Sequence, residues 1–309
     1  GSRCNDKGTE AYQGPAILYT RINRMNNKIK TDNMKLKAYK YQGAGNDFVI
    51  VDNRDGKLSL TTEQINWLCD RRFGIGGDGL MILGPSEKYD FSMRYFNADG
   101  PEGTMCGNGG RCLVAFAAHL GVKKFEFEAI DGYHIATVED FTPHRCIVRL
   151  RMVDLKECRR FAGQSFFLNT GSPHYVEFVK DLANYLVDEK GKYWRYYHEF
   201  VGGTNVNFVE PCENKIKVRT YERGVEAETW ACGTGVTASS ICTWLQTRSH
   251  YSSCEKVNDT ITHVKYDIEA LGDKLAVEFD FNEKDNSFTN IFLTGPATFV
   301  FSTEIDMQK

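Results

Sequence analysis

Residues 97–109 read Asn-Ala-Asp-Gly-Pro-Glu-Gly-Thr-Met-Cys-Gly-Asn-Gly, and residues 221–235 read Tyr-Glu-Arg-Gly-Val-Glu-Ala-Glu-Thr-Trp-Ala-Cys-Gly-Thr-Gly. In each stretch a strand-like segment ends in a glycine turn. A short loop and Cys-Gly-x-Gly follow, and then a helical pattern, at 107–120 and 233–246. Two copies of one strand–loop–cysteine–helix unit predict a duplicated domain with a pseudo-two-fold axis. The starts of the two helices would then face each other across a cleft.

Strand patterns dominate the rest of the chain, which predicts a mixed α/β fold. Apolar and polar residues alternate or apolar runs recur at 47–52, 79–84, 89–96, 125–128, 144–152, 205–210, 214–222, 262–270, 274–281 and 288–302. A further helix is expected over 62–72, where Thr61 and Gln64 have the spacing of a capping box. The polar stretches 188–204 and 247–260 are interpreted as surface loops.

Composition narrows the class of protein. The 309 residues carry a net charge of -3, so no basic excess exists to bind nucleic acid or an anionic membrane. No apolar run reaches the roughly 18 residues of a spanning helix, and no secretory signal pattern is present. The ten cysteines are scattered without a Cys-x-x-Cys pair, which favours a reduced, cytoplasmic protein and predicts no metal site.

The first 33 residues are expected to be an appendage. Gly1-Ser2 resembles the scar of a cleaved tag, and residues 3–33 are polar without periodicity. The ordered domain is predicted to begin near Met34, just before a strand-like segment at 36–41.

The two cysteines at the predicted helix starts have a chemical use. A helix N-terminus presents unpaired N–H groups and a partial positive charge, which stabilise both a thiolate and a bound carboxylate. Cys106 and Cys232 are therefore predicted to be thiols of low pKa on opposite faces of one α-carbon. One would remove the α-proton and the other would deliver a proton to the opposite face. On this pattern alone, buried packing remains the alternative for either cysteine.

A second glycine motif is a poor candidate for nucleotide binding. Residues 74–79 read Gly-Ile-Gly-Gly-Asp-Gly and fit the dinucleotide fingerprint in letters. The fingerprint requires a strand before it and a helix after it, whereas a helical pattern precedes it here and a strand pattern follows. No lysine stands in a context that suggests a pyridoxal Schiff base, so no cofactor is predicted.

Several motifs resemble those of the diaminopimelate epimerase family and follow that family's order from about Met34 on. They are Gly43-Ala44-Gly45-Asn46-Asp47-Phe48, Phe73-Gly74-Ile75-Gly76, Phe96-Asn97-Ala98-Asp99-Gly100, Met105-Cys106-Gly107-Asn108-Gly109-Gly110-Arg111-Cys112, Gly203-Thr204-Asn205-Val206-Asn207-Phe208, Tyr221-Glu222-Arg223-Gly224 and Ala231-Cys232-Gly233-Thr234-Gly235.

This resemblance implies a fold, an activity and domain boundaries. The fold has two pseudo-symmetric halves, each a curved mixed sheet around a central helix, with the active site in the cleft between them. Residues 34–151 with 297–309 would form the half with Cys106, and residues 152–296 the half with Cys232. The implied activity is the cofactor-independent interconversion of LL- and meso-diaminopimelate, on the route to lysine and peptidoglycan precursors, by a homodimer.

The resemblance also implies roles for individual residues. Cys106 and Cys232 match the family's catalytic pair. The α-carboxylate would be held by backbone N–H groups at Gly107, Asn108, Gly233 and Thr234. The far end of the substrate would be read by the amides of Asn46, Asn97 and Asn205 and by the guanidinium of Arg223. Glu222 matches a carboxylate near the amino groups of the substrate. For each asparagine, a local turn contact is the alternative; for Glu222 and Arg223, it is a surface ion pair.

Two positions near the expected pocket are less certain in role. Ser172 stands where the family commonly has asparagine, so one distal contact would be shortened or replaced by water. His174 is a candidate for the border of the pocket, and a structural, hydrogen-bonded histidine is the alternative. Gly79 replaces a glutamine found in some members, and Cys112 is interpreted as helix packing.

Other functions remain open at this point. A proline racemase or hydroxyproline epimerase shares the two-cysteine pattern, but its substrate has no distal charge and needs no counterpart of Glu222 and Arg223. A non-catalytic amino-acid-binding module would keep the cleft without needing both cysteines. A redox or zinc protein is the third class.

Overall fold

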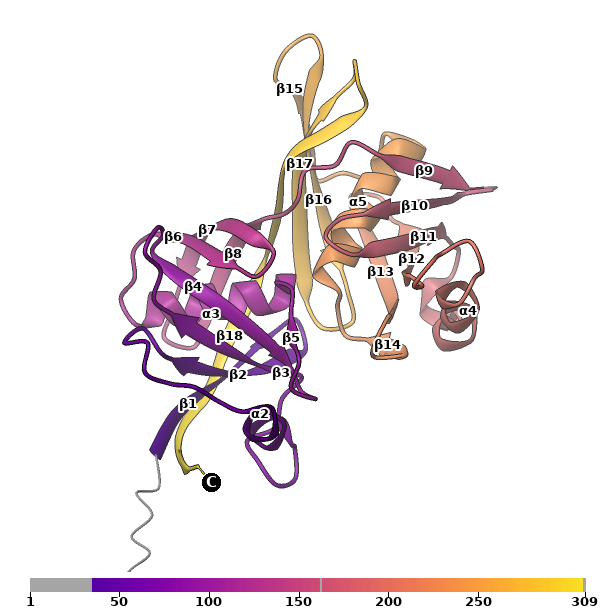
Figure 1. Ribbon diagram of the computed structural model, residues 1–309. Helices are drawn as coiled ribbons and strands as arrows, with labels where there is room; N and C mark the ends of the chain where they lie inside the picture. Colours follow the sequence, from indigo (N-terminus) through magenta and orange to yellow (C-terminus); the bar gives the residue numbers. More distant parts are fainter. Residues whose placement is uncertain (1–34, 162, 308–309) are drawn as a thin grey trace, which may run out of the picture. The chain divides into compact units, whose positions relative to one another are not determined.

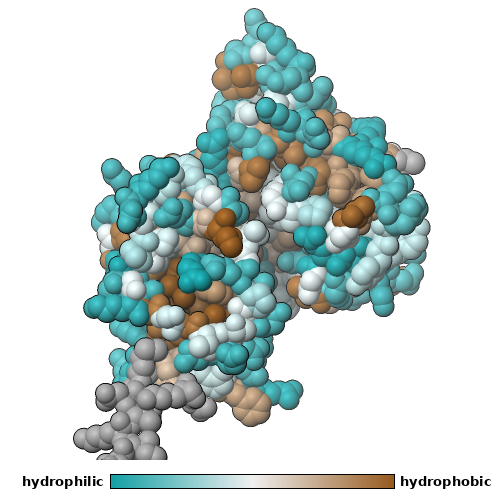
Figure 2. Space-filling view, viewed as in Figure 1, coloured by the Kyte–Doolittle hydropathy of each residue, from teal (hydrophilic) through white to brown (hydrophobic). Residues whose placement is uncertain are grey.

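The computed structural model describes residues 35–161 and 163–307, and its main compact body spans Lys37–Thr303 (Figure 1). The appendage expected over residues 1–33 lies outside the described residues. Hydrophilic residues cover most of the face seen in Figure 2, with hydrophobic residues scattered among them. No helix within the described ranges has the length and apolar character needed to cross a membrane.

The elements of the first half run from β1 to β8. They are β1 (Lys35–Gly43), β2 (Asn46–Asp52), α2 (Thr62–Cys69), β3 (Gly79–Gly84), β4 (Phe91–Asn97), β5 (Glu102–Gly103), α3 (Gly107–His119), β6 (Phe125–Ala129), β7 (Gly132–Phe141) and β8 (Arg145–Arg151). Strands β1 and β2 form a hairpin, β2 lies parallel to β3, β3 pairs antiparallel with β4, and β4 lies parallel to β6. The antiparallel pairs β6–β7 and β7–β8 continue the sheet.

The second half repeats this order. Its elements are β9 (Cys158–Phe161), β10 (Ser165–Asn169), β11 (Pro173–Phe178), η1 (Leu182–Asn184), α4 (Val187–Arg195), β12 (Asn205–Pro211), β13 (Lys215–Glu222), β14 (Ala227–Thr229), α5 (Gly233–Thr247), β15 (Ser253–Lys256), β16 (Ile261–Glu269) and β17 (Lys274–Asn282). Here β10 and β11 form the hairpin, β11 lies parallel to β12, β12 pairs with β13, and β13 lies parallel to β16. The match in pairing supports the duplication predicted from the two cysteine units.

Each half has one helix inside its core. Residues Gly107–Ala117 of α3 are all buried, and so are Gly235–Trp244 of α5. A helix that is buried all round must be enclosed by other elements. The prediction of a mixed α/β fold with a central helix in each half is confirmed.

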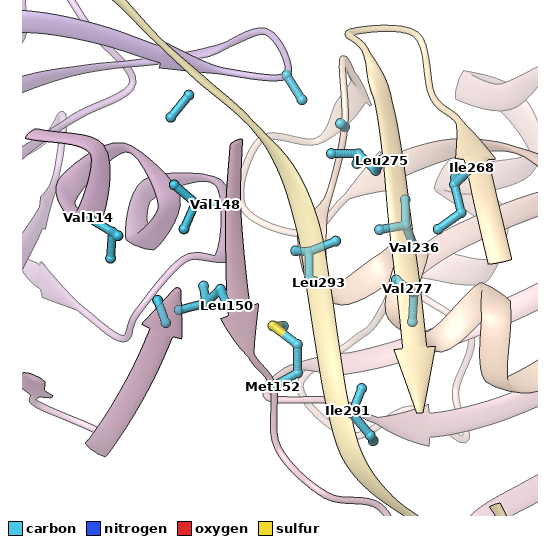
Figure 3. Packing of buried hydrophobic residues seen from close by; sticks show 14 of the residues in the cluster. Val114, Val148, Leu150, Met152, Val236, Ile268, Leu275, Val277, Ile291 and Leu293 are labelled. Carbon is cyan, nitrogen blue, oxygen red and sulfur yellow. The ribbon is translucent and has the colours of Figure 1, made fainter. Parts of the chain in front are cut away.

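Strand β18 (Ser287–Asp306) joins the two sheets. It pairs with β17 from Ser287 to Thr294 and with β8 from Gly295 to Thr298. Figure 3 shows Leu293 of β18 between Leu150 of β8 and Val277 of β17, so the cores of both halves meet at this strand. The domain boundaries expected from the sequence remain predictions.

Two predicted loops are wrong. The stretch 188–204 contains most of helix α4, and the stretch 247–260 contains strand β15. Helix α2 ends at Cys69 rather than at residue 72, and the sequence patterns missed β5, β7, β9, β10, β11 and β14. The missed strands are either short or rich in exposed positions, so their alternation is weak.

Candidate active site

Both candidate catalytic cysteines occupy the N-cap position of a central helix. Cys106 precedes α3 with φ -93° and ψ 131°, and Cys232 precedes α5 with φ -109° and ψ 113°. Neither side chain makes a capping hydrogen bond to its helix. The sulfur atoms are thus not used to close the helix ends, and both lie at the positive end of a helix dipole.

The starts of the two helices are in contact. A Cβ atom built on Gly233 would lie 3.2 Å from the Cα of Gly107, and one built on Gly107 would lie 3.4 Å from the Cα of Gly233. The side chain of Leu293 on β18 packs over both glycines. Only glycine lets the two backbones approach this closely, so the free N–H groups of both helices lie within reach of one small anion.

We expect Gly233→Ala to lower kcat/KM about tenfold to a hundredfold. The added methyl would lie 2.9 Å from Leu293 Cδ2 and 3.2 Å from the Gly107 Cα, so the two helix starts must move apart by a few tenths of an ångström. Misplacement on the order of 1 Å costs about a hundredfold when two groups must act on one atom. Steady-state kinetics beside Thr247→Ala, at the far end of α5, measure the effect. Unchanged kinetics in Gly233→Ala would show that the close approach is not needed.

A cavity of about 1070 Å³ opens over these helix starts. It is lined by nearly every residue that the sequence nominated: Asn46, Asn97, Cys106, Gly107, Asn108, Ser172, Asn205, Glu222, Arg223, Cys232, Gly233 and Thr234. The exception is His174, which is fully buried and does not line the cavity. The alternative interpretation of His174, as a structural histidine, fits its position.

His174 lies behind the Cys232 side of the cavity in a chain of hydrogen bonds. Asn207 Nδ2 donates to His174 Nδ1 at 3.0 Å, so the proton of the neutral ring is on Nε2. That nitrogen lies 2.8 Å from Thr234 Oγ1, which lies 3.4 Å from Cys232 Sγ. Burial, followed by the charge of Arg223, lowers the pKa of His174 to about 3. The ring is therefore neutral at physiological pH.

The depressed pKa of His174 predicts a loss of stability on acidification. Below pH 6.5 the unfolded chain binds a proton at this histidine that the folded protein does not bind until about pH 3. The free energy of unfolding should therefore fall by about 2 kcal/mol from this residue between pH 7 and pH 5. Urea unfolding at both pH values tests this, and His174→Gln should show the smaller drop. Equal drops in the two proteins would contradict the prediction.

Several asparagine side chains in the site are satisfied within the protein. Asn108 Nδ2 donates to Asn46 Oδ1 at 2.6 Å and to the carbonyl of Ala231 at 2.7 Å, and its Oδ1 accepts from Arg111. The side chain of Asn108 thereby ties α3 to the loop before Cys232. Its backbone N–H is the group left to bind a ligand.

Asn205 has a similar position in the second half. Its Oδ1 accepts from the backbone N–H of Arg223 at 2.9 Å, and its Nδ2 donates to Ser172 Oγ and to the Pro173 carbonyl. The local-contact alternative therefore describes Asn205 in this structure. Asn97 differs, since no hydrogen bond joins its side chain to another residue among those described.

Two opposite charges face the cavity without pairing with each other. Glu222 accepts a hydrogen bond from Thr229 Oγ1 at 2.9 Å, and burial raises the pKa of its carboxyl. Among the described residues, the guanidinium of Arg223 donates a hydrogen bond only to the carbonyl of Gly202, at 3.4 Å, and forms no ion pair. The cavity can thus receive a ligand that carries both an ammonium and a carboxylate group.

The expectation of low-pKa thiols is wrong for the protein as described. Burial raises the pKa of Cys106 and of Cys232, and the charge of Glu222 acts in the same direction. The nearby N–H groups of Asn108 and Gly109 at Cys106, and the Thr234 hydroxyl and the N–H of Gly235 at Cys232, lower it only in part. The sequence reveals a helix start, but desolvation of the sulfur outweighs it here.

Several cavity residues were missed from the sequence. These are Cys69, Arg71, Asp78, Tyr95 and Trp230. Of these residues, Asp78 lies within the glycine-rich segment 74–79, which the sequence analysis had singled out as a motif. Helix α2 precedes this segment and β3 follows it, as predicted, and its residues Gly77 and Asp78 line the cavity. Within the described residues no group of His, Cys, Asp and Glu side chains is arranged to hold a metal ion.

Solved structures of known proteins share this fold. A phenazine biosynthesis protein of the PhzF family from Bacillus anthracis superposes with a TM-score of 0.68 at 16% identity, over 88% of this chain and 99% of that chain. A hydroxyproline epimerase from Agrobacterium vitis superposes with a TM-score of 0.58 at 14% identity, over 89% and 93% of the two chains. At these identities the likeness shows the fold alone.

Sequence comparisons go further than the fold and match the chain to one family of amino-acid isomerases. The family model for diaminopimelate epimerase matches residues 38–149 and 166–300. The chain is 46% identical to a diaminopimelate epimerase from Flavobacterium psychrophilum over 279 residues, which cover 87% of this chain and 100% of the relative. It is 41% identical to one from Chlorobaculum tepidum, over 86% of this chain and 99% of the relative. The chain belongs to the diaminopimelate epimerase family.

Proposed function

We propose that this protein interconverts LL- and meso-diaminopimelate, with Cys106 and Cys232 as paired acid and base. The observation that carries this mechanism is the position of both cysteines as N-caps of two helices whose first residues touch at the floor of one cavity. As a member of its family, the protein serves lysine biosynthesis.

The α-carboxylate of the substrate would lie across the two helix starts. The N–H groups of Gly107, Asn108, Gly233 and Thr234 are the donors there. Negative charge grows on this carboxylate as the α-proton leaves. Fixed donors and two helix dipoles stabilise that charge without having to reorganise.

The proton transfers leave the atoms balanced. The thiolate of one cysteine takes the α-proton and becomes a thiol, and the bonding electron pair passes into the α-carboxylate. The thiol of the other cysteine then gives its proton to the opposite face and becomes the thiolate. The configuration at the α-carbon is inverted, and the two cysteines have exchanged protonation states.

The raised thiol pKa values fit a site that is activated by its substrate. Diaminopimelate brings an ammonium group next to the carbon between the two sulfur atoms, and a nearby positive charge favours a thiolate. On the Cys232 side, His174 Nε2 lies within hydrogen-bond distance of Ser172 Oγ and of Thr234 Oγ1, and Thr234 Oγ1 in turn contacts the Cys232 sulfur. We assign His174 the role of a positioning residue.

The charged side chains that line the cavity favour diaminopimelate over proline as the substrate. Glu222 and Arg223 both line the cavity, and a substrate with a distal ammonium and carboxylate can satisfy both. Proline and hydroxyproline carry neither group. We keep the hydroxyproline or proline epimerase as the second candidate because it shares the fold.

Solvent exchange tests this proposal directly. The protein is incubated with LL-diaminopimelate in D₂O under reductant, and the α-proton signal is followed by NMR beside a parallel sample of proline. We expect deuterium to enter diaminopimelate as the meso isomer appears, with proline unchanged. Exchange into proline alone would transfer the assignment to the second candidate. Exchange into neither would leave the family fold without the proposed reaction.

The proposal also covers the cellular location and the oligomeric state of the enzyme. The nine cysteines in the described part of the chain are free, as a reduced, cytoplasmic protein requires. Resemblance to the family supports a homodimer. Light scattering on the eluting protein would measure the mass, and a value near 35.1 kDa would refute the dimer.

A further inference from the structure

A positive charge lies buried behind the floor of the cavity. Arg111 on α3 is fully buried and is not among the residues that line the cavity. Within residues 35–161 and 163–307 its guanidinium forms no ion pair with a carboxylate, and its Nε has no hydrogen-bond partner. Burying a charge without a counter-ion is costly, because neither water nor an opposite charge offsets its desolvation. Such a charge points to an anionic partner that is not part of the chain.

The guanidinium lies against β18, the strand at which the two halves meet. A Cβ atom on Gly295 would lie 3.1 Å from Arg111 Nε. Two residues earlier on the same face of this strand, Leu293 packs over Gly107 and Gly233, the first residues of the two central helices. The unpaired charge is thus placed behind the two helix starts that the proposed function assigns to the α-carboxylate.

Two hydrogen bonds join the guanidinium to the start of α3. Nη1 donates to the carbonyl of Gly107 at 3.1 Å, and Nη2 donates to Asn108 Oδ1 at 2.9 Å. The Gly107 carbonyl and the Asn108 N–H belong to one peptide unit, so Nη1 is less than about 6 Å from the Asn108 nitrogen. A donor at the carbonyl polarises the peptide and strengthens its N–H as a donor. The charge of Arg111 therefore acts on an N–H group that would hold the α-carboxylate.

The same arginine also fixes the contact between the two cysteine-bearing loops. Because Asn108 Oδ1 accepts from Arg111, the amide is oriented with Nδ2 toward the second half. There Nδ2 donates to the carbonyl of Ala231 at 2.7 Å, and Ala231 immediately precedes Cys232. One buried side chain thus orders the backbone at both helix starts.

We infer that the α-carboxylate of the substrate is the counter-ion of Arg111, and that this arginine stabilises the negative charge that grows on the carboxylate as the α-proton leaves. The inference rests on the proposed function and deepens it. Arg111 does not touch the substrate; it acts through the Gly107–Asn108 peptide and is a positioning residue. Its surroundings exclude water, so its charge is little screened over this distance. Because the carboxylate is more negative in the transition state than in the bound substrate, the arginine should affect kcat more than KM.

The test compares Arg111→Met, which removes the charge from a side chain of similar length, with Arg111→Lys, which keeps the charge. We expect Arg111→Met to lower kcat/KM about 10²- to 10³-fold, mostly through kcat, as the loss of a fixed donor to a developing anion does. Arg111→Lys should stay within about tenfold of wild type. Arg248→Met is the matched control, since Arg248 lies at the far end of α5, packs over Trp244 and does not line the cavity. It should stay within about twofold.

Three kinetic results would contradict the inference. The first is a kcat/KM of Arg111→Met within about threefold of wild type. The second is a lysine variant as slow as the methionine variant, because the two-pronged hydrogen bonding and not the charge would then be required. If Arg111→Met does not fold, the folded lysine variant still decides, and a loss of more than about a hundredfold in it is the third.

Binding of pimelate separates this inference from the proposed function. Pimelate carries both carboxylates of the substrate and neither ammonium group, so its binding by calorimetry reports the carboxylate sites without turnover. Its Kd should rise about threefold to tenfold in Arg111→Met and stay within about twofold in Arg248→Met. An unchanged Kd in Arg111→Met would overturn the inference. Absence of α-proton exchange in the wild-type protein would instead refute the proposed function, and weaker pimelate binding in Arg111→Met would then still support the arginine as the counter-ion of a bound carboxylate.

Discussion

Serine in place of Cys106 or Cys232 is expected to lower kcat/KM by about 10³- to 10⁴-fold in both directions. Each cysteine is required twice in a cycle, once as base and once as acid, and loss of one well-placed general acid or base costs about 10²- to 10⁴-fold. Serine is nearly the size of cysteine, so packing at the helix start is kept. Its hydroxyl is a far poorer base than a thiolate.

The two cysteine variants also distinguish the two faces of the α-carbon. Deuterium incorporation is measured separately from LL- and from meso-diaminopimelate in each variant. Cys254→Ser is the matched control, since Cys254 is exposed on β15 and does not line the active-site cavity. Activity within tenfold of wild type in either N-cap variant would exclude the two-thiol mechanism.

The second large effect is expected at Arg223. Arg223→Ala should lower kcat/KM for diaminopimelate by about 10²- to 10³-fold, mostly through KM. The guanidinium lines the cavity without an ion pair among the described residues, and its planar fork can bind both oxygens of a carboxylate. Removing it leaves the distal carboxylate in the cavity without its partner.

A surface arginine provides the comparison for this variant. Arg151 is partly exposed and pairs with Asp154 outside the cavity, so Arg151→Ala should change kcat/KM by less than twofold. Both variants remove one positive charge from the chain. A difference between them therefore reports the local contact of Arg223 with the substrate and not the change in net charge. An undiminished kcat/KM in Arg223→Ala would remove the distal-carboxylate role.

The duplicated architecture could be predicted from the sequence because its signals are local. Cys-Gly-x-Gly marks the start of α3 and of α5, and the alternation in 274–281 marks β17. That the two helix starts face each other was also predicted, from the matched contexts of the two cysteines, whereas the contact of Gly107 with Gly233 emerged only from the structure. These signals depend on residues that are neighbours in the chain.

Helix α4 was missed because its apolar face is narrow. Only Val187 and Gly191 are buried, Trp194 is partly buried one turn further on, and five of the nine residues are charged. Its position is fixed by a tertiary contact instead. A Cβ atom on Gly191 would lie 2.3 Å from the Cβ of Tyr221, so the helix is held by the close approach of β13.

The electrostatics of the site depend on burial, which the sequence does not contain. A helix start predicts a stabilised thiolate. Burial of Cys232 excludes the water that would also stabilise the thiolate, and the pKa of the thiol is raised instead. The free amide of Asn97 and the satisfied amide of Asn205 look alike in sequence. The difference arises because Ser172 and Pro173, more than thirty residues before Asn205, lie beside its side chain.

Strand β18 sets an order of events during protein synthesis. The free edge of β8 is covered only when residues 295–298 arrive, roughly 150 residues after β8 has left the ribosome. At about 5–20 residues per second, the ribosome needs roughly 10–30 s to supply them. For that interval the nascent first half exposes an unpaired strand edge, which other chains can extend. Premature termination before β18 should therefore yield aggregates rather than a folded first half, and a chaperone that shields the β8 edge would raise the yield of active enzyme.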